Sequence, residues 1–478
     1  MEKNNVSMED IVSLCKRRGF IFSGSEIYGG LAGTFDYGPM GVLLKRNITN
    51  AWWKHFVENR DDMYGMDADI LMNAKAWEAS GHVAGFSDPL IDCLKCKKRF
   101  RTDHLIDNEE YKNFLKDFKD NPEYSWKEDG VWTGALPTLY LLNKSIKCKE
   151  CGNISWSESR QFNMMFKTQV GAMEDSSATV YLRPETAGGM FVNYKNVMDS
   201  IHPKLPFGLA QIGKAFRNEI TPRDFIFRLR ELEQMEIEYF IDPKTWEEKF
   251  EELRKSFKEF MISIGIREAG IHEIEIGDGD RAHYSKRTID FEFDFPIGQK
   301  ELAGLAYRGD FDLTAHASLS GAKLDYLDEA TGEKFVPHVI EPSIGVERTV
   351  LAVLASAYHN EDLGEGDSRV VLKLKPSIAP IKVCVSPLLK NKEQLVGKAN
   401  EIYKTLKKEF GSVVYDDNGN IGKRYRRQDE IGTPFCVVVD FDTVETDDCV
   451  GVRDRDTMQQ ERVKVSELKS YLAERLKM

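Results

Sequence analysis

Hydrophobic and polar positions along the chain predict a succession of helices and strands without an internal repeat. Helices are predicted at residues 8–19, 42–57, 246–264 and 346–358. Strands are predicted within residues 160–240 and at residues 289–295 and 335–340. Residues 91–160 break this pattern, because they are rich in lysine and carry a charged middle around Glu109 to Glu128. We expect them to form an insertion.

The last hundred residues or so show a different pattern. After a break at residues 375–380, the segments IKVCVSP, VVYDD and FCVVVDF are predicted strands, and residues 392–410 are a predicted helix. This order favours a separate small α/β domain with a mixed or parallel sheet. A basic cluster around Tyr425 in this domain suits single-stranded RNA, through phosphate neutralisation and base stacking. A solvated basic loop is the alternative for its members Lys423, Arg424, Arg426 and Arg427.

Residues 216–240 carry an unusual density of charge for a hairpin. The segment reads FRNEITPRDFIFRLRELEQMEIEYF, with strand at both ends and a turn at Pro222 and Asp224. Alternate residues of an extended chain share a face. Arginine forks bind phosphate oxygens, and carboxylates accept from amines. We therefore predict a ligand with a polyanionic end and an ammonium end, although a salt-bridged exposed hairpin is the alternative. The predicted face carries Arg217 and Glu219, then Arg228, Arg230, Leu232, Gln234 and Glu236.

Composition limits the class of protein. The length of 478 residues allows two or three domains with a large core. A formal charge of −12 argues against a protein that simply coats nucleic acid, although local basic patches still permit RNA binding. No apolar run is long enough for a membrane span, and MEKNNVSMED at the start is not a secretory signal. Eight cysteines in such a chain fit reduced thiols or metal ligands, so a cytoplasmic location is expected.

Four of the cysteines form two closely spaced pairs. Cys93-x2-Cys96 and Cys148-x2-Cys151 have the spacing of tetrahedral zinc sites. The segment between the pairs has to loop out for them to meet. We predict a structural zinc site, with metal-free reduced cysteines as the alternative. Four thiolates leave no open coordination position, so the pairs do not indicate a catalytic metal.

Three other segments carry charged residues in suggestive places. RPETA sets Glu185 beside a stiffening proline, and KELAGLAYRGDFDL carries Glu301 and Arg308. In HVIEPSIGVERTV a predicted strand ends at Glu341, and Arg348 lies in the first turn of a helix. A guanidinium at a helix N-terminus makes a good anion site. Taken singly, each segment is also compatible with solvated surface charge.

Taken together, these segments resemble the three signature motifs of class II aminoacyl-tRNA synthetases, and they are most similar to the dimeric glycyl-tRNA synthetase family. Motif 1, the dimer-forming helix, is matched by FDYGPMGVLLKRNITNAWW. Motif 2 is matched by FRNE with FRLRELEQMEIEYF, and motif 3 by HVIEPSIGVERTVLAVL. Glycyl-specific segments are matched by RPETA, ELAGLAYRGDFDL, DNGNIGKRYRRQDEIGTPFCVVVDFD and VRDRD. The resemblance covers nearly the whole chain.

The resemblance implies an α+β fold, with a class II catalytic core of antiparallel sheet flanked by helices at residues 1–90 and 161–375. Residues 91–160 would be the insertion, and residues 380–478 an α/β anticodon-binding domain. The implied activity is the ATP-dependent attachment of glycine to its tRNA through a glycyl-adenylate, with Mg²⁺. The implied state is a cytoplasmic homodimer without membrane contact.

The resemblance also implies roles for particular residues. Arg217, Arg348 and Glu301 are the implied catalytic residues. Arg217 would bind the α-phosphate, Glu219 the adenine amino group, Arg228 and Arg348 the outer phosphates, and Glu301 the Mg²⁺. The implied ATP-binding set is Arg217, Asn218, Glu219, Phe227, Arg228, Leu229, Arg230, Glu231, Leu232, Glu301, Leu302, Gly345, Val346, Glu347 and Arg348.

The glycine ammonium would lie among Glu185, Glu236 and Glu341, with Arg308 and Ser343 completing the pocket. The implied glycine-binding set is Arg101, Glu185, Leu232, Glu233, Gln234, Met235, Glu236, Arg308, Glu341, Pro342, Ser343, Ile344 and Gly345. A synthetase for another amino acid would predict an apolar or hydroxyl-bearing pocket instead of carboxylates. A regulatory protein that keeps only the fold would predict loss of the charged catalytic residues, which are all present.

Three positions depart from the family pattern. Leu232 stands where a phenylalanine usually stacks on adenine, so an apolar contact is kept but stacking is lost. Gly188 replaces a usual glutamine, and Gly309 replaces a usual threonine. None of these changes removes a charge assigned to substrate.

Overall fold

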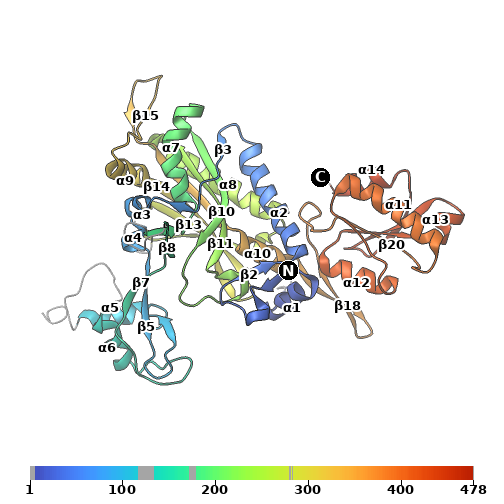
Figure 1. The fold of residues 1–478 in the computed structure, drawn as a ribbon, viewed down its shortest axis with the longest axis horizontal. Coiled ribbons are helices and arrows are strands. Elements are labelled where there is room, and N and C mark those ends of the chain that lie inside the picture. Colours follow the sequence, from blue (N-terminus) through green and yellow to red (C-terminus); the bar gives the residue numbers. More distant parts are fainter. Residues whose placement is uncertain (1–5, 117–133, 172–178, 279–280, 283, 477–478) are drawn as a thin grey trace.

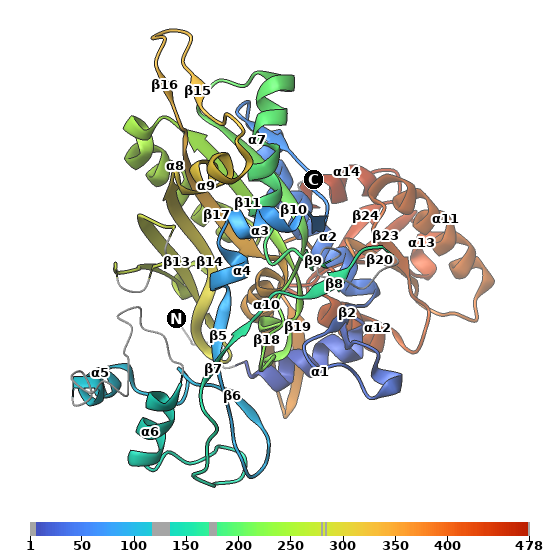
Figure 2. The ribbon, with the colours of Figure 1, turned by 60° about the vertical axis from the view of Figure 1, so that its left-hand side comes forward.

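The computed structural model describes residues 6–116, 134–171, 179–278, 281–282 and 284–476. A large body is built around a seven-stranded sheet, and a C-terminal unit lies beside it, on the right in Figure 1. A smaller unit lies on the other side of the large body and includes β5, β6, β7, α5 and α6 (Figure 2). Within the described ranges, every helix is too short or too polar to span a membrane.

The central sheet is antiparallel except at one edge, where β3 runs parallel to β10. This agrees with the expected antiparallel core. The strand order is β12-β13-β14-β17-β11-β10-β3. The strands are β3 (Met63–Gly65), β10 (Phe207–Phe216), β11 (Glu231–Ile241), β12 (Ile271–Glu275), β13 (Arg287–Phe295), β14 (Gly298–Gly309) and β17 (His338–Gly345).

Helices cover both faces of this sheet. Successive residues of β11 show the division, because Ile237 and Tyr239 belong to one hydrophobic cluster and Phe240 to another. The first cluster includes residues of α1 (Met8–Arg18), α2 (Pro39–Trp53), α8 (Trp246–Ser263) and α10 (Val346–Ala357). The second includes residues of α7 (Ala187–Ile201) and α9 (Phe311–Ser320). The four predicted helices are confirmed, and the second continues as a π-helical turn at Lys54–Glu58.

The prediction that a strand ends at Glu341 was wrong, because β17 continues to Gly345. Proline has no N–H for a sheet ladder, and it is rare in central strands. The ladder between β11 and β17 accordingly lapses around Pro342, between the pairs Glu236–Ser343 and Tyr239–Ile340. The strand itself persists because β14 pairs with it on the other side.

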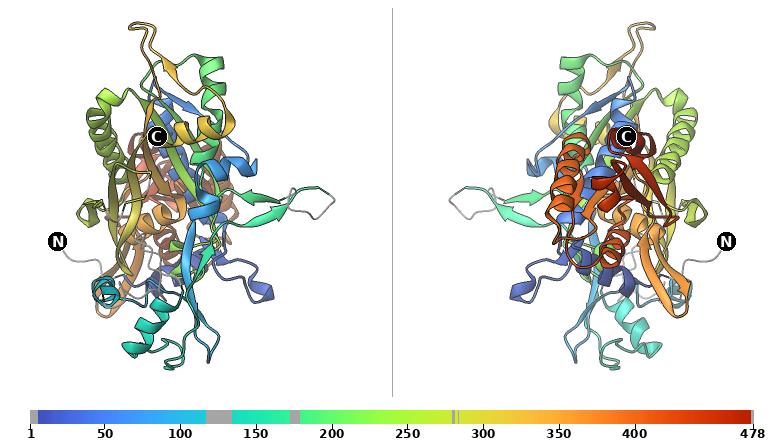
Figure 3. Two further views of the ribbon diagram at one scale, coloured as in Figure 1. Left: turned by 90° about the vertical axis from the view of Figure 1, so that its left-hand side faces the viewer. Right: turned by 90° about the vertical axis from the view of Figure 1, so that its right-hand side faces the viewer.

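Short hairpins and helices lie around the central sheet of the large body. Strands β8 and β9 project from one side of it (Figure 3). The remaining strands are β1 (Ile21–Ser23), β2 (Phe35–Tyr37), β4 (Leu71–Met72), β8 (Lys167–Gln169), β9 (Thr179–Leu182), β15 (Tyr326–Leu327), β16 (Lys334–Phe335), β18 (Tyr358–Gly364) and β19 (Asp367–Leu372). The remaining helices are α3 (Ala74–Ala79) and α4 (His82–Gly85), with short 3-10 turns that include η4 (Phe225–Phe227).

The smaller unit contains a three-stranded sheet of order β6-β5-β7 and two helices. Its own hydrophobic cluster includes Tyr111, Tyr140 and Trp156. Part of the charged middle expected around Glu109 to Glu128 lies outside the described residues. The elements are β5 (Ser87–Asp92), β6 (Arg99–Arg101), α5 (Asn108–Lys116), α6 (Ala135–Asn143) and β7 (Arg160–Asn163).

The C-terminal unit has a five-stranded mixed sheet of order β21-β20-β22-β23-β24, as the alternation of strands and helices predicted. Helices α11 and α14 pack on one face through a hydrophobic cluster. The elements are β20 (Val383–Pro387), α11 (Glu393–Phe410), β21 (Val413–Tyr415), α12 (Ile421–Ile431), β22 (Phe435–Val439), α13 (Phe441–Glu445), β23 (Cys449–Asp454), β24 (Gln460–Lys464) and α14 (Leu468–Leu476).

The basic cluster around Tyr425 is neither a loop nor a free basic surface. It forms helix α12, and Arg424 is buried and donates to the carbonyl oxygens of Pro387, Asp417 and Gly419. Arg426 and Arg427 form ion pairs with Asp367 and Asp416. The guanidinium of Arg453 lies over the Tyr425 ring, 4.7 Å from its centroid. Arg424 and Arg427 are therefore engaged within the unit, Arg426 pairs with β19 at its boundary, and Lys423 is exposed.

Candidate active site

A pocket of about 370 Å³ opens at the end of the β10–β11 hairpin, between β11, β14, β17 and the start of α10. It brings together side chains from the four charged segments that the sequence singled out. The predicted residues that line it are Glu185, Arg217, Glu219, Phe227, Arg228, Leu229, Leu232, Gln234, Glu236, Glu301, Leu302, Glu341, Ser343, Gly345, Glu347 and Arg348.

The charged hairpin is less regular than its pattern predicted. Strand β10 ends at Phe216 and β11 begins at Glu231, so Arg217 and Glu219 lie beyond the ladder. Arg228 follows the short helix η4. Arg230 does not line the pocket, because its guanidinium donates to the carbonyl oxygens of Ala32 and Glu219. Arg217 and Arg228 therefore line the pocket, whereas Arg230 hydrogen-bonds the protein backbone.

One end of the pocket is cationic. The Arg217 guanidinium lies 5.5 Å from the centroid of the Phe86 ring, and its Nε donates to the Pro184 carbonyl oxygen at 3.1 Å. Arg348 stacks on Phe227 with its Cζ 4.5 Å from the ring centroid. Arg348 also donates through Nε to the Phe227 carbonyl oxygen and through Nη1 to the Glu301 carbonyl oxygen. Among the described residues, no protein oxygen accepts from Nη1 or Nη2 of Arg217 or from Nη2 of Arg348. Such an end suits phosphate oxygens.

Two carboxylates lie beside this cationic end. Glu301 Oε2 is 3.2 Å from Arg348 Nη1, and the charge of Arg348 lowers the pKa of Glu301. Asp290, which sequence analysis missed, also lines the pocket from the neighbouring strand β13. Burial raises the pKa of Asp290 to about 6, and the negative charges of Glu301 and Glu292 add to the effect. A divalent cation would relieve this repulsion, since carboxylates are its preferred ligands.

The other end of the pocket is acidic. Glu185, Glu236 and Glu341 all line it, and each has its own hydrogen-bond donor. The backbone N–H and hydroxyl of Thr186 donate to Glu236, and Nη1 of Arg308 donates to Glu341. Nε2 of His82 lies 3.3 Å from Glu185 Oε2. Arg308 is almost fully buried, and its Nε and Nη2 donate to Asp312.

These carboxylates differ in charge. Burial raises the pKa of Glu236, and the charge of Glu185 raises it further. Burial also raises the pKa of Glu341 to about 8, although Arg308 opposes the shift. For Glu185 burial is outweighed by the charge and hydrogen bond of His82 and by two arginines, so its pKa falls to about 2. Glu185 is therefore the anion of the three, Glu341 retains a proton at neutral pH, and the pKa of Glu236 is raised.

Several predicted residues have side chains outside the pocket. In β11 and β17 the side chains alternate, so Leu232, Gln234, Glu236 and Ser343 face inward and their neighbours face away. Glu231 pairs with Lys214, Glu233 pairs with Lys45, and Met235 lies in the core. The predicted residues that do not line the pocket are Asn218, Arg230, Glu231, Glu233, Met235, Arg308, Pro342, Ile344, Val346 and Arg101.

Arg101 in particular is engaged elsewhere. Its Nη1 donates to Asp88 at 2.7 Å, and its Nε and Nη2 donate to the two carboxylate oxygens of Asp103. Three of its five N–H donors are thereby used by Asp88 on β5 and by Asp103 just after β6. The structure does not place the Arg101 guanidinium against the acidic end of the pocket.

The three departures from the family pattern have different surroundings. Leu232 lines the pocket and packs against the main hydrophobic cluster. A Cβ atom at Gly188 would lie 2.8 Å from the Trp77 ring, so that ring allows no larger residue without moving. Gly309 has a φ of +65°, which a β-branched threonine rarely adopts. The two glycines therefore agree with the local backbone and packing.

Sequence analysis missed several residues of the pocket wall. Alternation in TIDFEFDF places Thr288 and Asp290 on one face and could have identified them, but Tyr284 and Arg281 lie in an irregular connection. The Tyr284 ring lies over the Arg308 guanidinium, 3.8 Å from Cζ. The missed lining residues are Ile226, Ile276, Arg281, Ala282, Tyr284, Thr288, Asp290, Ala303, Gly304, Leu305 and Ala306.

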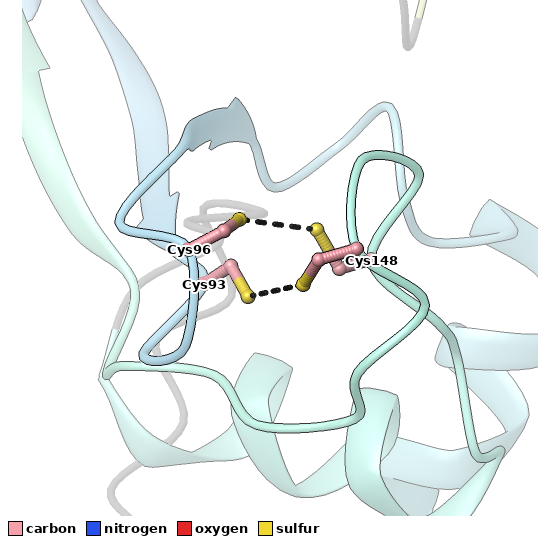
Figure 4. A group of neighbouring side chains, drawn as sticks. Cys93, Cys96 and Cys148 are labelled. Carbon is pink, nitrogen blue, oxygen red and sulfur yellow. Dashed lines mark hydrogen bonds between the residues drawn. The ribbon is translucent and has the colours of Figure 1, made fainter.

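The two cysteine pairs meet in the smaller unit, where two loops face each other (Figure 4). The Sγ atoms of Cys93 and Cys151 are 3.6 Å apart, and those of Cys96 and Cys148 are 3.7 Å apart. All four sulfur atoms lie within 4.8 Å of one another. Zinc–thiolate bonds of about 2.3 Å in a tetrahedron require sulfur atoms about 3.8 Å apart. The cluster therefore has the dimensions of a four-thiolate metal site.

Two family models match the chain. The model described as the tRNA synthetase class II core domain (G, H, P, S and T) matches residues 166–357. The model described as an anticodon binding domain matches residues 382–475. The first covers most of the pocket, and the second covers most of the C-terminal unit.

Relatives of known name match over nearly the full length. The chain is 50% identical over 471 residues to the glycine–tRNA ligase of Alkaliphilus oremlandii. This match covers 98% of this chain and 99% of the relative. It is 49% identical over 475 residues to that of Clostridium acetobutylicum, covering 99% of this chain and 100% of the relative. A prolyl-tRNA synthetase structure from Cryptosporidium parvum is similar in fold, with a TM-score of 0.63 at 15% identity, over 98% of this chain and 77% of that one.

Proposed function

This chain belongs to the glycine–tRNA ligase family of class II aminoacyl-tRNA synthetases, and from this we propose that its pocket binds ATP at the cationic end and glycine at the acidic end. The protein joins glycine to tRNA in an ATP-dependent reaction that passes through a glycyl-adenylate. The observation that carries the proposal is the meeting of Arg217 and Arg348 with three acidic residues, Glu185, Glu236 and Glu341, in one pocket.

In the proposed first step, the glycine carboxylate attacks the α-phosphate of ATP and diphosphate leaves. Arg217 would bind the α-phosphate and stabilise the charge that builds up there, while Arg228 and Arg348 bind the outer phosphates. Glu219 would accept a hydrogen bond from the adenine amino group, with Leu232 as an apolar neighbour of the base. Such chemistry depends on position and charge rather than on a covalent enzyme intermediate.

Mg²⁺ would bind at the carboxylate side of the cationic end. Glu301 is the proposed ligand, and Asp290 is the second carboxylate available there. When bound, the ion would neutralise charge on the phosphate oxygens.

Glycine selectivity would come from charge and from lack of space. Glycine has no side chain that the protein could bind, so the carboxylates would bind its ammonium group. Ser343 and the inward-facing Gln234 would limit the room at its Cα, and Arg308 would act from outside the pocket through Glu341. Exclusion by size is effective here because every competing amino acid is larger, and no editing site is needed on this reasoning.

The direct test of this function is glycine-dependent exchange of pyrophosphate into ATP by the full-length protein. We expect exchange with glycine and much weaker exchange with alanine or serine at equal concentration. Exchange that depends on a different amino acid, or no exchange by folded protein, would contradict the proposal.

The protons held by the acidic end predict a pH-dependent affinity for glycine. An ammonium group favours ionised carboxylates, and burial raises the pKa of Glu341 to about 8. Binding below that pH therefore has to release a proton. We expect KM for glycine at saturating ATP to rise as pH falls below 8, by up to about tenfold per pH unit. Calorimetry in two buffers of different ionisation enthalpy would measure the proton release, and a flat KM from pH 6 to 8 would contradict it.

We also propose that the four cysteines of the smaller unit bind a structural Zn²⁺. The ion would cross-link the loops of Cys93 and Cys148 without taking part in the reaction. A Cys148→Ser variant is expected to lose about one zinc per chain and to unfold at a lower temperature. Cys449→Ser, in the C-terminal unit, is the control and should keep its metal. Equal zinc content in the two variants would contradict the site.

The remaining assignments follow from the family. We propose residues 1–90 and 161–375 as the catalytic domain, 91–160 as the insertion and 380–478 as the domain that binds the anticodon of tRNA(Gly). A homodimer in the cytoplasm is also proposed. Exposed Ile27, Tyr28 and Leu31, in the loop that precedes the motif 1 helix, support a surface that a second copy covers.

A further inference from the structure

His82 is a buried imidazole behind the acidic end of the pocket, and sequence reasoning gave it no role. It lies in α4, between the core and the strand that leads into the smaller unit. Its Nε2 is 3.3 Å from Glu185 Oε2, and its Nδ1 is 2.8 Å from Ser80 Oγ. Both His82 and Ser80 are buried. The ring therefore bridges a buried hydroxyl and a pocket carboxylate.

The direction of the hydrogen bonds follows from the chemistry of these groups. A ring nitrogen that faces a carboxylate has to carry a proton, because two lone pairs at this distance would repel. Ser80 Oγ lies close to Nδ1 and 3.4 Å from the Trp77 carbonyl oxygen. Ser80 can donate to Nδ1 of a neutral ring or accept from a charged one. In both states Nε2–H of His82 donates to Glu185.

Aromatic neighbours hold the ring in this orientation. Trp77 meets it edge to face with centroids 5.5 Å apart, and Phe86 packs on it at 5.4 Å. Phe86 also lies under the Arg217 guanidinium. Asn163 Nδ2 donates to the carbonyl oxygens of His82 and Val83, which fixes the backbone of the turn. The imidazole cannot rotate without breaking contacts on several sides.

The charge of Glu185 depends on this partner. Burial acts to raise its pKa, and the charge and hydrogen bond of His82 are the largest opposing causes. Its neighbours Glu236 and Glu341 have donors of their own in Thr186 and Arg308, yet their pKa values stay raised. Glu185, ionised and in contact with His82, is therefore a suitable partner for an ammonium group.

We propose that His82 is a positioning residue that, through Nε2–H, orients Glu185 toward the substrate ammonium. The inference rests on the proposed glycine-binding role of Glu185. Ser80 continues this series of hydrogen bonds, because its hydroxyl contacts Nδ1, the other ring nitrogen of His82. His82 itself contacts no substrate.

Two amide variants separate positioning from packing. Glutamine at position 82 can place its Nε2 near the native Nε2, whereas asparagine can reach only the Nδ1 position and Ser80. In pyrophosphate exchange we expect His82→Asn to raise KM for glycine about tenfold or more while KM for ATP changes less than about twofold. His82→Gln should recover most of the affinity for glycine. Ser80→Ala, which removes only a hydroxyl, should raise KM for glycine by a smaller factor.

A Glu185→Gln variant identifies which proposal fails. If KM for glycine is unchanged in Glu185→Gln, the proposed role of Glu185 fails. If it rises there but not in His82→Asn, only the positioning role fails. Positioning also predicts that His82→Asn has little further effect when combined with Glu185→Gln.

Equal losses in the two amide variants, with KM for ATP rising in parallel, would show a packing role and overturn the inference. Should His82→Asn not fold, Ser80→Ala and His82→Gln decide, and a KM for glycine unchanged in Ser80→Ala would then count against it.

Discussion

An Arg217→Ala variant is expected to lose glycine-dependent pyrophosphate exchange by about 100- to 1,000-fold, the usual cost of removing one preorganised charge-stabilising donor. Arg217 is the proposed ligand of the phosphate at which the new bond forms, so its contribution should be largest when charge develops there. The loss is therefore expected mainly in kcat, with a smaller change in KM for glycine. The measurement is steady-state exchange at saturating and subsaturating substrates.

The fold should tolerate this change. The Arg217 side chain makes one hydrogen bond to the Pro184 carbonyl oxygen and one ring contact with Phe86, while its backbone N–H still bonds Arg230. Arg223→Ala is a matched control in the same connection, because that arginine pairs with its neighbour Asp224 and does not line the pocket. Exchange by Arg217→Ala that equals that of Arg223→Ala would refute the assignment.

An Asp429→Ala variant is expected to destabilise the protein by about 3–5 kcal/mol, because it leaves two buried guanidinium groups without their shared carboxylate. Asp429 lies on α12 and accepts from Arg453 at 2.8 and 3.0 Å and from Arg369 at 3.1 Å. All three side chains are buried. Arg369 comes from β19 of the large body, so this cluster holds the C-terminal unit against it.

Urea unfolding of the full-length protein measures the loss. The matched control is Asp367→Ala at the same boundary, which breaks an exposed pair with Arg426 and should cost less than about 1 kcal/mol. Attachment of glycine to tRNA by Asp429→Ala should fall more than pyrophosphate exchange does, because only the former needs both units in register. Equal stability of the two variants would contradict a central role for the buried cluster.

Local pattern explains much of what was predictable. Helical periodicity in residues 246–264 and alternation in residues 289–295 depend on neighbours in the chain, and both elements formed as expected. The mixed sheet of the C-terminal unit followed from strands that alternate with helices. The continuation of β17 past Pro342 did not follow, because it depends on pairing with β14. That pairing joins residues distant in sequence.

The candidate active site also combines features that local pattern predicted with features that depend on contacts between distant residues. Alternation correctly placed Leu232, Gln234 and Glu236 on one face, but the ranges taken from the family included side chains such as Met235 that face the core. Arg101 was assigned to glycine by the family resemblance, and Arg424 was predicted to face RNA as part of the basic cluster around Tyr425. Their observed partners are Asp88 and Asp103 in one case and backbone carbonyls in the other. Charge identifies a residue that needs a partner, whereas only the fold identifies the partner.

By itself, the sequence determined which chemical groups are present and how they are spaced along strands and between cysteines. Those properties indicated the family, the two-ended ligand and the thiolate cluster, because residue type and local periodicity are encoded in short segments. Tertiary structure decided which arginines face the pocket, which carboxyl groups have raised pKa values, and that His82 contacts Glu185. These outcomes depend on burial and on contacts between distant segments, which no local pattern contains.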